Sequence, residues 1–208
     1  MVILGNMKIA ISLNEVLRDF IGQFGYTYEK YIGEIDFKKN PVNSFDLEKH
    51  FKFNSIDEMN KFLYDEAALE IFGHADQIED NIMNAFNMFL MDIKDDEEHE
   101  VEIVSREAVK SIPSTFFFLS KLSCRIDKIR FVMDYEDYWD GVDVLITANP
   151  KALEAKPKDK LAIKIKSTYN ESSSADFELD SLKDFISDET LREKILNTKI
   201  TTYEEIED

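Results

Sequence analysis

The sequence is poor in the residues that form disulfides, histidine-based sites and cationic surfaces. Its single cysteine, Cys124, cannot form an internal disulfide, which favours a reducing compartment. Its 3 histidines lie apart, without the spacing of a metal site or a catalytic triad. Its 25 lysines and arginines are outnumbered by 43 acidic residues, so the net charge is −18. We therefore expect no nucleic-acid partner and no anionic lipid surface, because both are bound by clustered cations.

Long hydrophobic runs are also missing. No stretch reaches the roughly eighteen uncharged apolar residues of a membrane helix, so we expect no membrane partner. The first residues, Met-Val-Ile-Leu-Gly-Asn, lack the basic region and apolar core of a signal peptide. We expect the protein to work in the cytoplasm, or in a virus particle assembled in the host cytoplasm. With 44% hydrophobic and 12% aromatic residues, the 208-residue chain can fill one core that carries an inserted subdomain.

The stretch around which the chain is organised begins at Met7. Apolar residues crowd together from Lys8 to Leu13, which predicts a buried strand. From Glu15 onward the apolar residues fall at helical spacing, which predicts a helix. The strand should therefore end, and the helix begin, between Ser12 and Glu15. In an open parallel α/β sheet, ligands bind at such corners.

This stretch resembles the first motif of the haloacid dehalogenase-like (HAD) phosphohydrolases, in particular the deoxyribonucleotidase-like branch found in large tailed bacteriophages. That motif is an apolar strand followed by Asp-x-Asp-Gly-Val-Leu-x-Asp. On this pattern, Ser12 stands at the nucleophilic Asp, Asn14 at the second catalytic Asp, and Glu15 at the Gly. The pattern is kept at Val16, Leu17 and Asp19. The resemblance thus implies the family's frame without its catalytic carboxylates.

Later segments support the same resemblance. The segment from Val142 to Pro150 is similar to the family's Asp-Val-Leu-Ile-Asp-Asp-Asn-Pro, whose carboxylates hold Mg²⁺, but Thr147 and Ala148 stand at those positions. Ser105 follows a predicted strand and stands where the family has a phosphate-binding hydroxyl; a helix cap is its simpler role. The family's lysine before the later strand has no counterpart, because residues 131–143 contain no Lys or Arg.

The resemblance implies an α/β, three-layer HAD-like Rossmannoid fold with a central parallel sheet and an inserted helical cap. The expected core comprises residues 1–24 and 99–208, and residues 25–98 form a mainly helical cap with an acidic linker. Hydrophobic periodicity and capping signals predict further strands at 101–105, 128–133, 142–147 and 161–165, and helices at 55–73, 76–93, 106–123, 181–186 and 189–196. The acidic run 92–102 is interpreted as a solvated linker.

Phosphoryl transfer of the family's kind needs a carboxylate nucleophile, an acid, Mg²⁺ and a fixed cation. Because these are replaced, we expect no catalysis, no metal and no cofactor. The first hypothesis is a pseudophosphatase module that binds protein partners, for instance as a structural or assembly component of a phage particle. A second is a nucleotide- or phosphate-binding pseudoenzyme that uses Ser105. A third is an active deoxyribonucleotidase-like hydrolase with Ser12 as an unusual nucleophile. The oligomeric state stays open.

Overall fold

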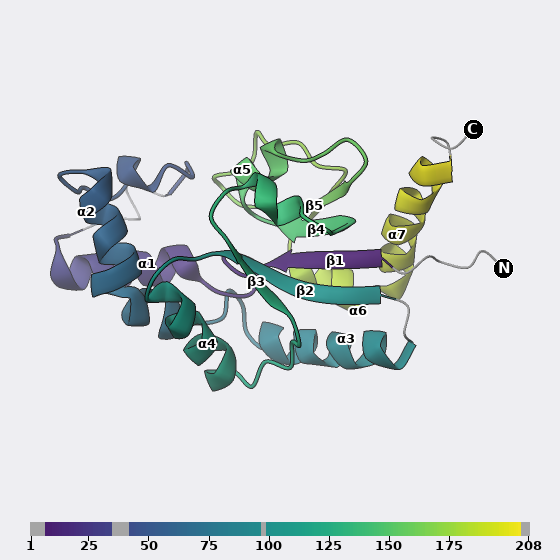
Figure 1. Ribbon diagram of the computed structural model, residues 1–208, viewed down its shortest axis with the longest axis horizontal. Coiled ribbons are helices and arrows are strands. Elements are labelled where there is room, and N and C mark those ends of the chain that lie inside the picture. The colour runs from purple at the N-terminus through teal and green to yellow at the C-terminus, as the bar shows by residue number, and fades with distance from the viewer. Residues whose placement is uncertain (1–6, 35–41, 97–98, 205–208) are drawn as a thin grey trace.

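The computed structural model describes residues 7–34, 42–96 and 99–204 (Figure 1). Its centre is one six-stranded parallel sheet in the order β3-β2-β1-β4-β5-β6, which confirms the predicted α/β class. The strands are β1 (Met7–Ser12), β2 (His99–Arg106), β3 (Ile129–Val132), β4 (Val144–Thr147), β5 (Leu161–Ile165) and β6 (Phe177–Leu179). Within the described residues, no helix is both long and apolar enough to cross a membrane.

Helices cover both faces of the sheet and extend beyond one end of it (Figure 1). They are α1 (Phe20–Tyr31), α2 (Ile56–Lys61), α3 (Ile82–Asp96), α4 (Ser111–Lys121), α5 (Pro150–Glu154), α6 (Leu182–Ser187) and α7 (Glu189–Glu204). Short 3-10 turns are η1 (Leu47–Lys49) and η4 (Glu136–Trp139), and π-helical turns are η2 (Phe62–Glu66) and η3 (Leu69–Gly73). The sheet is therefore the middle of three layers.

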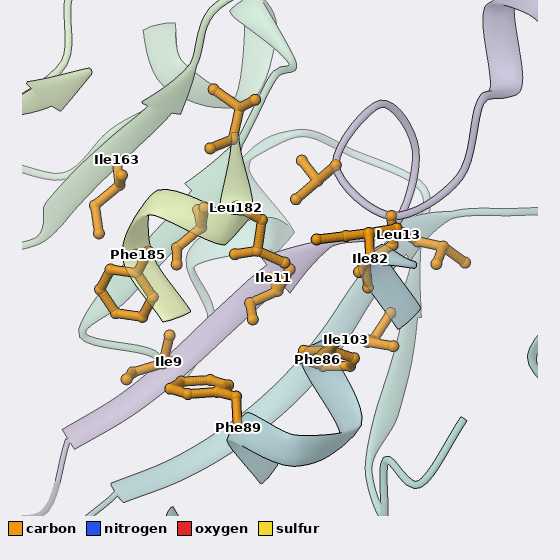
Figure 2. Packing of buried hydrophobic residues seen from close by; sticks show 14 of the residues in the cluster. Ile9, Ile11, Leu13, Ile82, Phe86, Phe89, Ile103, Ile163, Leu182 and Phe185 are labelled. Carbon is orange, nitrogen blue, oxygen red and sulfur yellow. The ribbon is translucent and has the colours of Figure 1, made fainter. Parts of the chain in front are cut away.

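Side chains alternate between the two faces of the sheet along each strand, so each face has its own cluster of buried apolar residues. Ile9 and Ile11 of β1 belong to the larger cluster, which packs against α3 and α6 through Phe86 and Phe185 (Figure 2). Ala10 points to the opposite face, where η4 and α5 cover a smaller cluster. Successive strand residues face opposite sides of a sheet, so a strand buried on both faces is apolar almost throughout. This is why the apolar run 8–13 predicted β1 correctly.

A third apolar cluster lies outside the sheet, in the segment between β1 and α3. It contains Phe24 and Tyr28 of α1, together with Phe51, Phe62 and further apolar residues around α2 and the π-helical turns. The Phe24 and Phe51 rings stack with centroids 4.0 Å apart. Figure 1 places α1 and α2 beyond the carboxyl end of β1. The segment thus forms a cap with its own core.

Several predicted boundaries are corrected. The helix after β1 begins at Phe20, not near Glu15, and Asp19 caps it by accepting a hydrogen bond from the Gly22 amide. The helix expected at 76–93 as a cap element is α3, and it packs on the sheet. The reason is that its apolar stripe packs against β2 and α6 in the larger core cluster. The strand β6 was not predicted, because three residues carry too little periodicity to be recognised.

The acidic run 92–102 is not a linker. Its first residues end α3 and its last residues begin β2; only 97–98 lie outside the described residues. Glu102 is buried and pairs with Lys128 and Arg130, at 2.5 and 2.8 Å. A carboxylate flanked by two cations can be buried, whereas the sequence pattern alone indicated only repulsion between neighbouring acids.

Candidate functional site

A tight turn follows β1 and positions the first predicted site residues. The amides of Leu17 and Arg18 both donate to the Leu13 carbonyl oxygen, at 3.0 Å each. Glu15 has a φ of +61°, a left-handed conformation that favours glycine. The resembled motif has Gly at this position, so the backbone conformation supports the alignment. The side chains of Ser12, Asn14 and Glu15 all line the same cavity.

Arg18 is the centre of a buried polar network behind this turn. Its Nε and Nη2 donate to Asn14 Oδ1 at 2.8 and 2.6 Å, and Nη2 lies 2.5 Å from Glu107 Oε1. Nη1 donates to Thr115 Oγ1 and to the Phe72 carbonyl oxygen. Burial lowers the pKa of Arg18, while the adjacent carboxylate opposes that shift. The network joins the β1 turn, the loop after β2, helix α4 and the cap.

Ser105 lies in the same network. Its hydroxyl is buried and donates to Glu107 Oε1 at 3.0 Å, an oxygen that also accepts from Thr115 Oγ1 at 3.1 Å. Ser105 is not among the described residues that line the cavity. A carboxylate therefore lies beside the hydroxyl that the family resemblance predicts to bind phosphate. Glu107 Oε2 is buried without a hydrogen-bond partner in the described part of the chain.

Thr147 and Ala148 follow β4 and are fully buried. The Thr147 hydroxyl accepts a hydrogen bond from the Asn149 amide at 3.0 Å. Asn149 Oδ1 in turn accepts from the amides of Lys151 and Ala152, so it caps α5. Of these residues, Asn149 and Lys151 line the cavity.

The cavity has a volume of about 260 Å³ and lies between the carboxyl ends of the strands and the cap. Segments following β1, β2, β3, β4 and β5 all contribute to its walls. They come together because the carboxyl ends of parallel strands meet at one edge of the sheet. The lining residues are Ser12, Asn14, Glu15, Phe20, Phe45, Asp46, Leu47, Glu48, Ile56, Met59, Asn60, Leu63, Tyr64, Phe72, Arg106, Tyr135, Tyr138, Asn149, Lys151 and Tyr169.

Glu15 is the cavity carboxyl with a strongly shifted acidity. Burial, with a smaller contribution from nearby Asp19, raises its pKa to about 7, although hydrogen bonds from the backbone oppose the shift. Its Oε1 accepts from the Ile21 amide at 2.8 Å. Burial and this carboxyl also raise the pKa of Tyr169. We did not predict Glu15, Asp46 or Glu48 as cavity carboxyls from the sequence, because our alignment followed only the positions of the family's acids.

These residues do not fit the magnesium ion that the resembled family uses. Ser12, Asn14, Thr147 and Ala148 offer no carboxylate, and the Asn14 oxygen already accepts two hydrogen bonds from a guanidinium. Mg²⁺ is usually held by one or two carboxylates in octahedral geometry. Across residues 7–34, 42–96 and 99–204 no three Asp, Glu, His or Cys side chains cluster as a metal site would require.

Solved structures share the arrangement of the whole chain. A protein described as haloacid dehalogenase-like from Burkholderia xenovorans LB400 has a TM-score of 0.58 at 10% identity, covering 89% of this chain and 97% of its own. A phosphonoacetaldehyde hydrolase-like protein from Oleispira antarctica has a TM-score of 0.58 at 10% identity, covering 96% of each chain. An HAD-hydrolase structure from Bacillus subtilis, bound to magnesium, has a TM-score of 0.56 at 11% identity, covering 88% of this chain and 98% of its own.

The chain has the fold of the HAD-like hydrolases. This confirms the predicted superfamily fold, with its central parallel sheet. No protein-family model and no curated protein sequence matches the chain. At 10 to 11% identity the likeness concerns the fold alone, and a fold does not determine what a site on it does.

Proposed function

We propose that this chain is a non-catalytic, HAD-like pseudoenzyme that binds a ligand in the capped cavity without hydrolysing it. The observation that carries the proposal is the Arg18 side chain, whose Nε and Nη2 both donate to Asn14 Oδ1. Because this guanidinium occupies Asn14 Oδ1, the side chain at the position of the second catalytic Asp is not available to a metal ion or to a leaving group. The partly open cavity that Asn14 lines, with a volume of about 260 Å³, can still admit a small molecule.

The side chains after β1 support binding over turnover. A serine hydroxyl needs a neighbouring base to act as a nucleophile, and Asn14 cannot accept a proton at neutral pH. Glu15 lines the same cavity, but its Oε1 is engaged by the Ile21 amide. Ser12 itself is buried, with 2% of its surface exposed. Loss of the nucleophile, the acid and the metal carboxylates together is the pattern of a retained fold that has lost its reaction.

Turnover assays test the proposal. The wild-type protein is incubated with 1-naphthyl phosphate and with deoxynucleoside monophosphates, with and without Mg²⁺, and released phosphate is measured. We expect no release above the buffer rate. Mg²⁺-dependent release that disappears in Ser12→Ala would contradict the proposal and favour an active deoxyribonucleotidase-like phosphohydrolase. The matched control is Ser44→Ala, a serine in the cap that does not line the cavity among the described residues.

A second candidate function is a protein-interaction module, such as a structural or assembly component of a phage particle. It is favoured by exposed apolar side chains on and around α4 and at the end of the edge strand β3. Phe116 and Phe117 lie on α4, Val109 precedes this helix and Met133 follows β3; they are 49%, 46%, 69% and 55% exposed. The Phe116 ring meets Phe131 of β3 edge-on, with centroids 5.5 Å apart. Exposed apolar groups of this kind mark interaction surfaces when they are contiguous.

This second candidate is tested by affinity capture from the source followed by mass analysis. A partner that is retained by wild type and lost with Phe116→Lys would support it. Tyr26→Lys is the control, because this exposed aromatic lies on α1 of the cap. Equal capture by both variants, or no stoichiometric partner at all, would contradict it.

A further inference from the structure

Aromatic rings line the cavity in two groups, and within each group neighbouring rings are in contact. On the cap side, Phe72 meets Phe20 and Tyr64, with ring centroids 5.3 and 5.8 Å apart. The second group runs from Tyr169 through Phe45 and Tyr135 to Tyr138, with successive centroids 6.0, 6.4 and 6.4 Å apart. Rings that face a cavity stack with flat ligands through offset or edge-on contacts.

Two cations complete the cavity wall at one ring. The Arg106 guanidinium carbon lies 5.5 Å from the centroid of Tyr135, and the Lys151 Nζ lies 5.6 Å from it. Arg106 also links the two ring groups, because its guanidinium lies over Tyr135 and its Nη1 donates to Tyr64 Oη at 3.2 Å. Its Nε donates to the Met133 carbonyl oxygen. A guanidinium has five donors, so Arg106 retains donors for a ligand.

Among the described residues, Lys151 forms one ion pair, and its distance is long. Its Nζ lies 3.6 Å from Asp46 Oδ1, while the other oxygen of Asp46 lies 2.7 Å from Lys49. The Lys151 side chain is 45% exposed. A ligand anion could therefore displace Asp46 from Lys151, and Asp46 would keep its closer partner.

We propose that the cavity binds an aromatic anion, with its ring among the cavity aromatics and its carboxylate or phosphate held by Arg106 and Lys151 beside Tyr135. This inference rests on the proposed function and specifies its ligand class. The volume of about 260 Å³ suits a ligand of one or two rings. The anion does not bind at Ser105, since the Glu107 carboxylate accepts from that hydroxyl and would repel a second anion.

Calorimetry with four matched probes tests this inference. The probes are 1-naphthoate and 1-naphthyl phosphate, which carry ring and charge, 1-naphthamide, which lacks the charge, and inorganic phosphate, which lacks the ring. We expect both aromatic anions to bind at least about tenfold more tightly than either other probe, because the amide lacks the charge-assisted hydrogen bond and inorganic phosphate lacks the stacked ring. The tighter of the two anions shows whether a carboxylate or a phosphate ester fits the site better.

Single variants test whether the bound anion contacts Lys151 and Arg106. Lys151→Gln should weaken 1-naphthoate about fivefold and leave 1-naphthamide unchanged, as expected for a half-exposed charge. Arg106→Gln should weaken it about tenfold or more. Asp46→Asn should tighten it about fivefold, because the competing carboxylate is removed. Lys156→Gln is the matched control, since this lysine pairs with Asp176 outside the cavity.

The outcomes separate this inference from the proposed function. Equal affinity for 1-naphthoate and 1-naphthamide, or unchanged affinity in both Lys151→Gln and Asp46→Asn, would overturn the aromatic-anion site. Lys151 and Asp46 are partly exposed, so these variants test the site even if Arg106→Gln fails to fold. Binding of 1-naphthyl phosphate with release of naphthol would overturn the non-catalytic function and leave the ligand class standing.

Discussion

Arg18 Nη2 lies 2.5 Å from Glu107 Oε1, and neither side chain has any surface exposed to solvent. The two residues are far apart in sequence. In the motif Asp-x-Asp-Gly-Val-Leu-x-Asp, Arg18 stands at the second x, a position for which the motif specifies no residue. Their pairing makes the residues behind the β1 turn a closed, buried polar cluster. It also ties the cap to the core, through the bond from Arg18 Nη1 to the Phe72 carbonyl oxygen.

The first prediction concerns this pair. Arg18→Met should lower the free energy of unfolding by about 3–5 kcal/mol, because it leaves the Glu107 carboxylate buried without its cation. Lys61→Met, which removes an exposed pair with Glu66, should lower it far less, because water already screens that pair. Urea unfolding followed by circular dichroism measures both. Equal costs for the two variants would show that the buried pair contributes no more than a surface pair.

A second prediction distinguishes the two roles of Ser105. If its hydroxyl serves the Glu107 carboxylate, Ser105→Ala should lower the free energy of unfolding by about 1–2 kcal/mol and leave the affinity for 1-naphthyl phosphate unchanged. If it binds phosphate, affinity should fall while stability changes little. Calorimetry and urea unfolding on the same variant separate the roles. Ser114→Ala, on α4, is a control that removes a hydroxyl bonded only to the Lys110 carbonyl oxygen.

The sheet could be predicted closely from the sequence because its signal is local. The run Leu161–Ile165 is apolar at every second position and buried throughout, and the predicted and observed bounds of β5 agree. The first strand differs by one residue at each end. Parallel strands buried on both faces are distinguished by continuous apolar runs, which a sequence displays without any knowledge of neighbours.

The site could be predicted only in part, because its chemistry comes from contacts between distant residues. Ser12 and Asn14 were placed at the cavity by the motif alone, and the φ of Glu15 supports that alignment. The pairing of Arg18 with Glu107, and the approach of Arg106 and Lys151 to one tyrosine, join segments that share no sequence pattern.

A capping signal at Ser55 was recognised correctly, since its Oγ accepts from the Glu58 amide three residues later.

A third prediction tests the placement of α3 on the sheet. Phe86 is fully buried in the cluster shown in Figure 2, so Phe86→Ala should lower the free energy of unfolding by about 3–5 kcal/mol. Met88 is on the same helix and 60% exposed, so Met88→Ala should change it by less than about 0.5 kcal/mol. Thermal unfolding of both variants measures the difference. A small effect of Phe86→Ala would contradict the assignment of α3 to the core.

The last prediction concerns the pH dependence of stability through Glu15. The pKa of this carboxyl is about 7 in the folded state and near 4.5 when exposed, so between these values the folded chain retains a proton that the unfolded chain has lost. Stability therefore falls as pH rises from about 4.5 to about 7, by up to about 3 kcal/mol, and then levels off.

Glu15→Gln keeps the shape of the side chain and abolishes its titration, so the stability of this variant should fall less over this pH range. Urea unfolding at intervals from pH 5 to pH 8 measures both proteins, with Glu48→Gln as a control at another carboxyl that lines the cavity. Parallel curves for wild type and Glu15→Gln would show that the Glu15 carboxyl titrates as if it were in water.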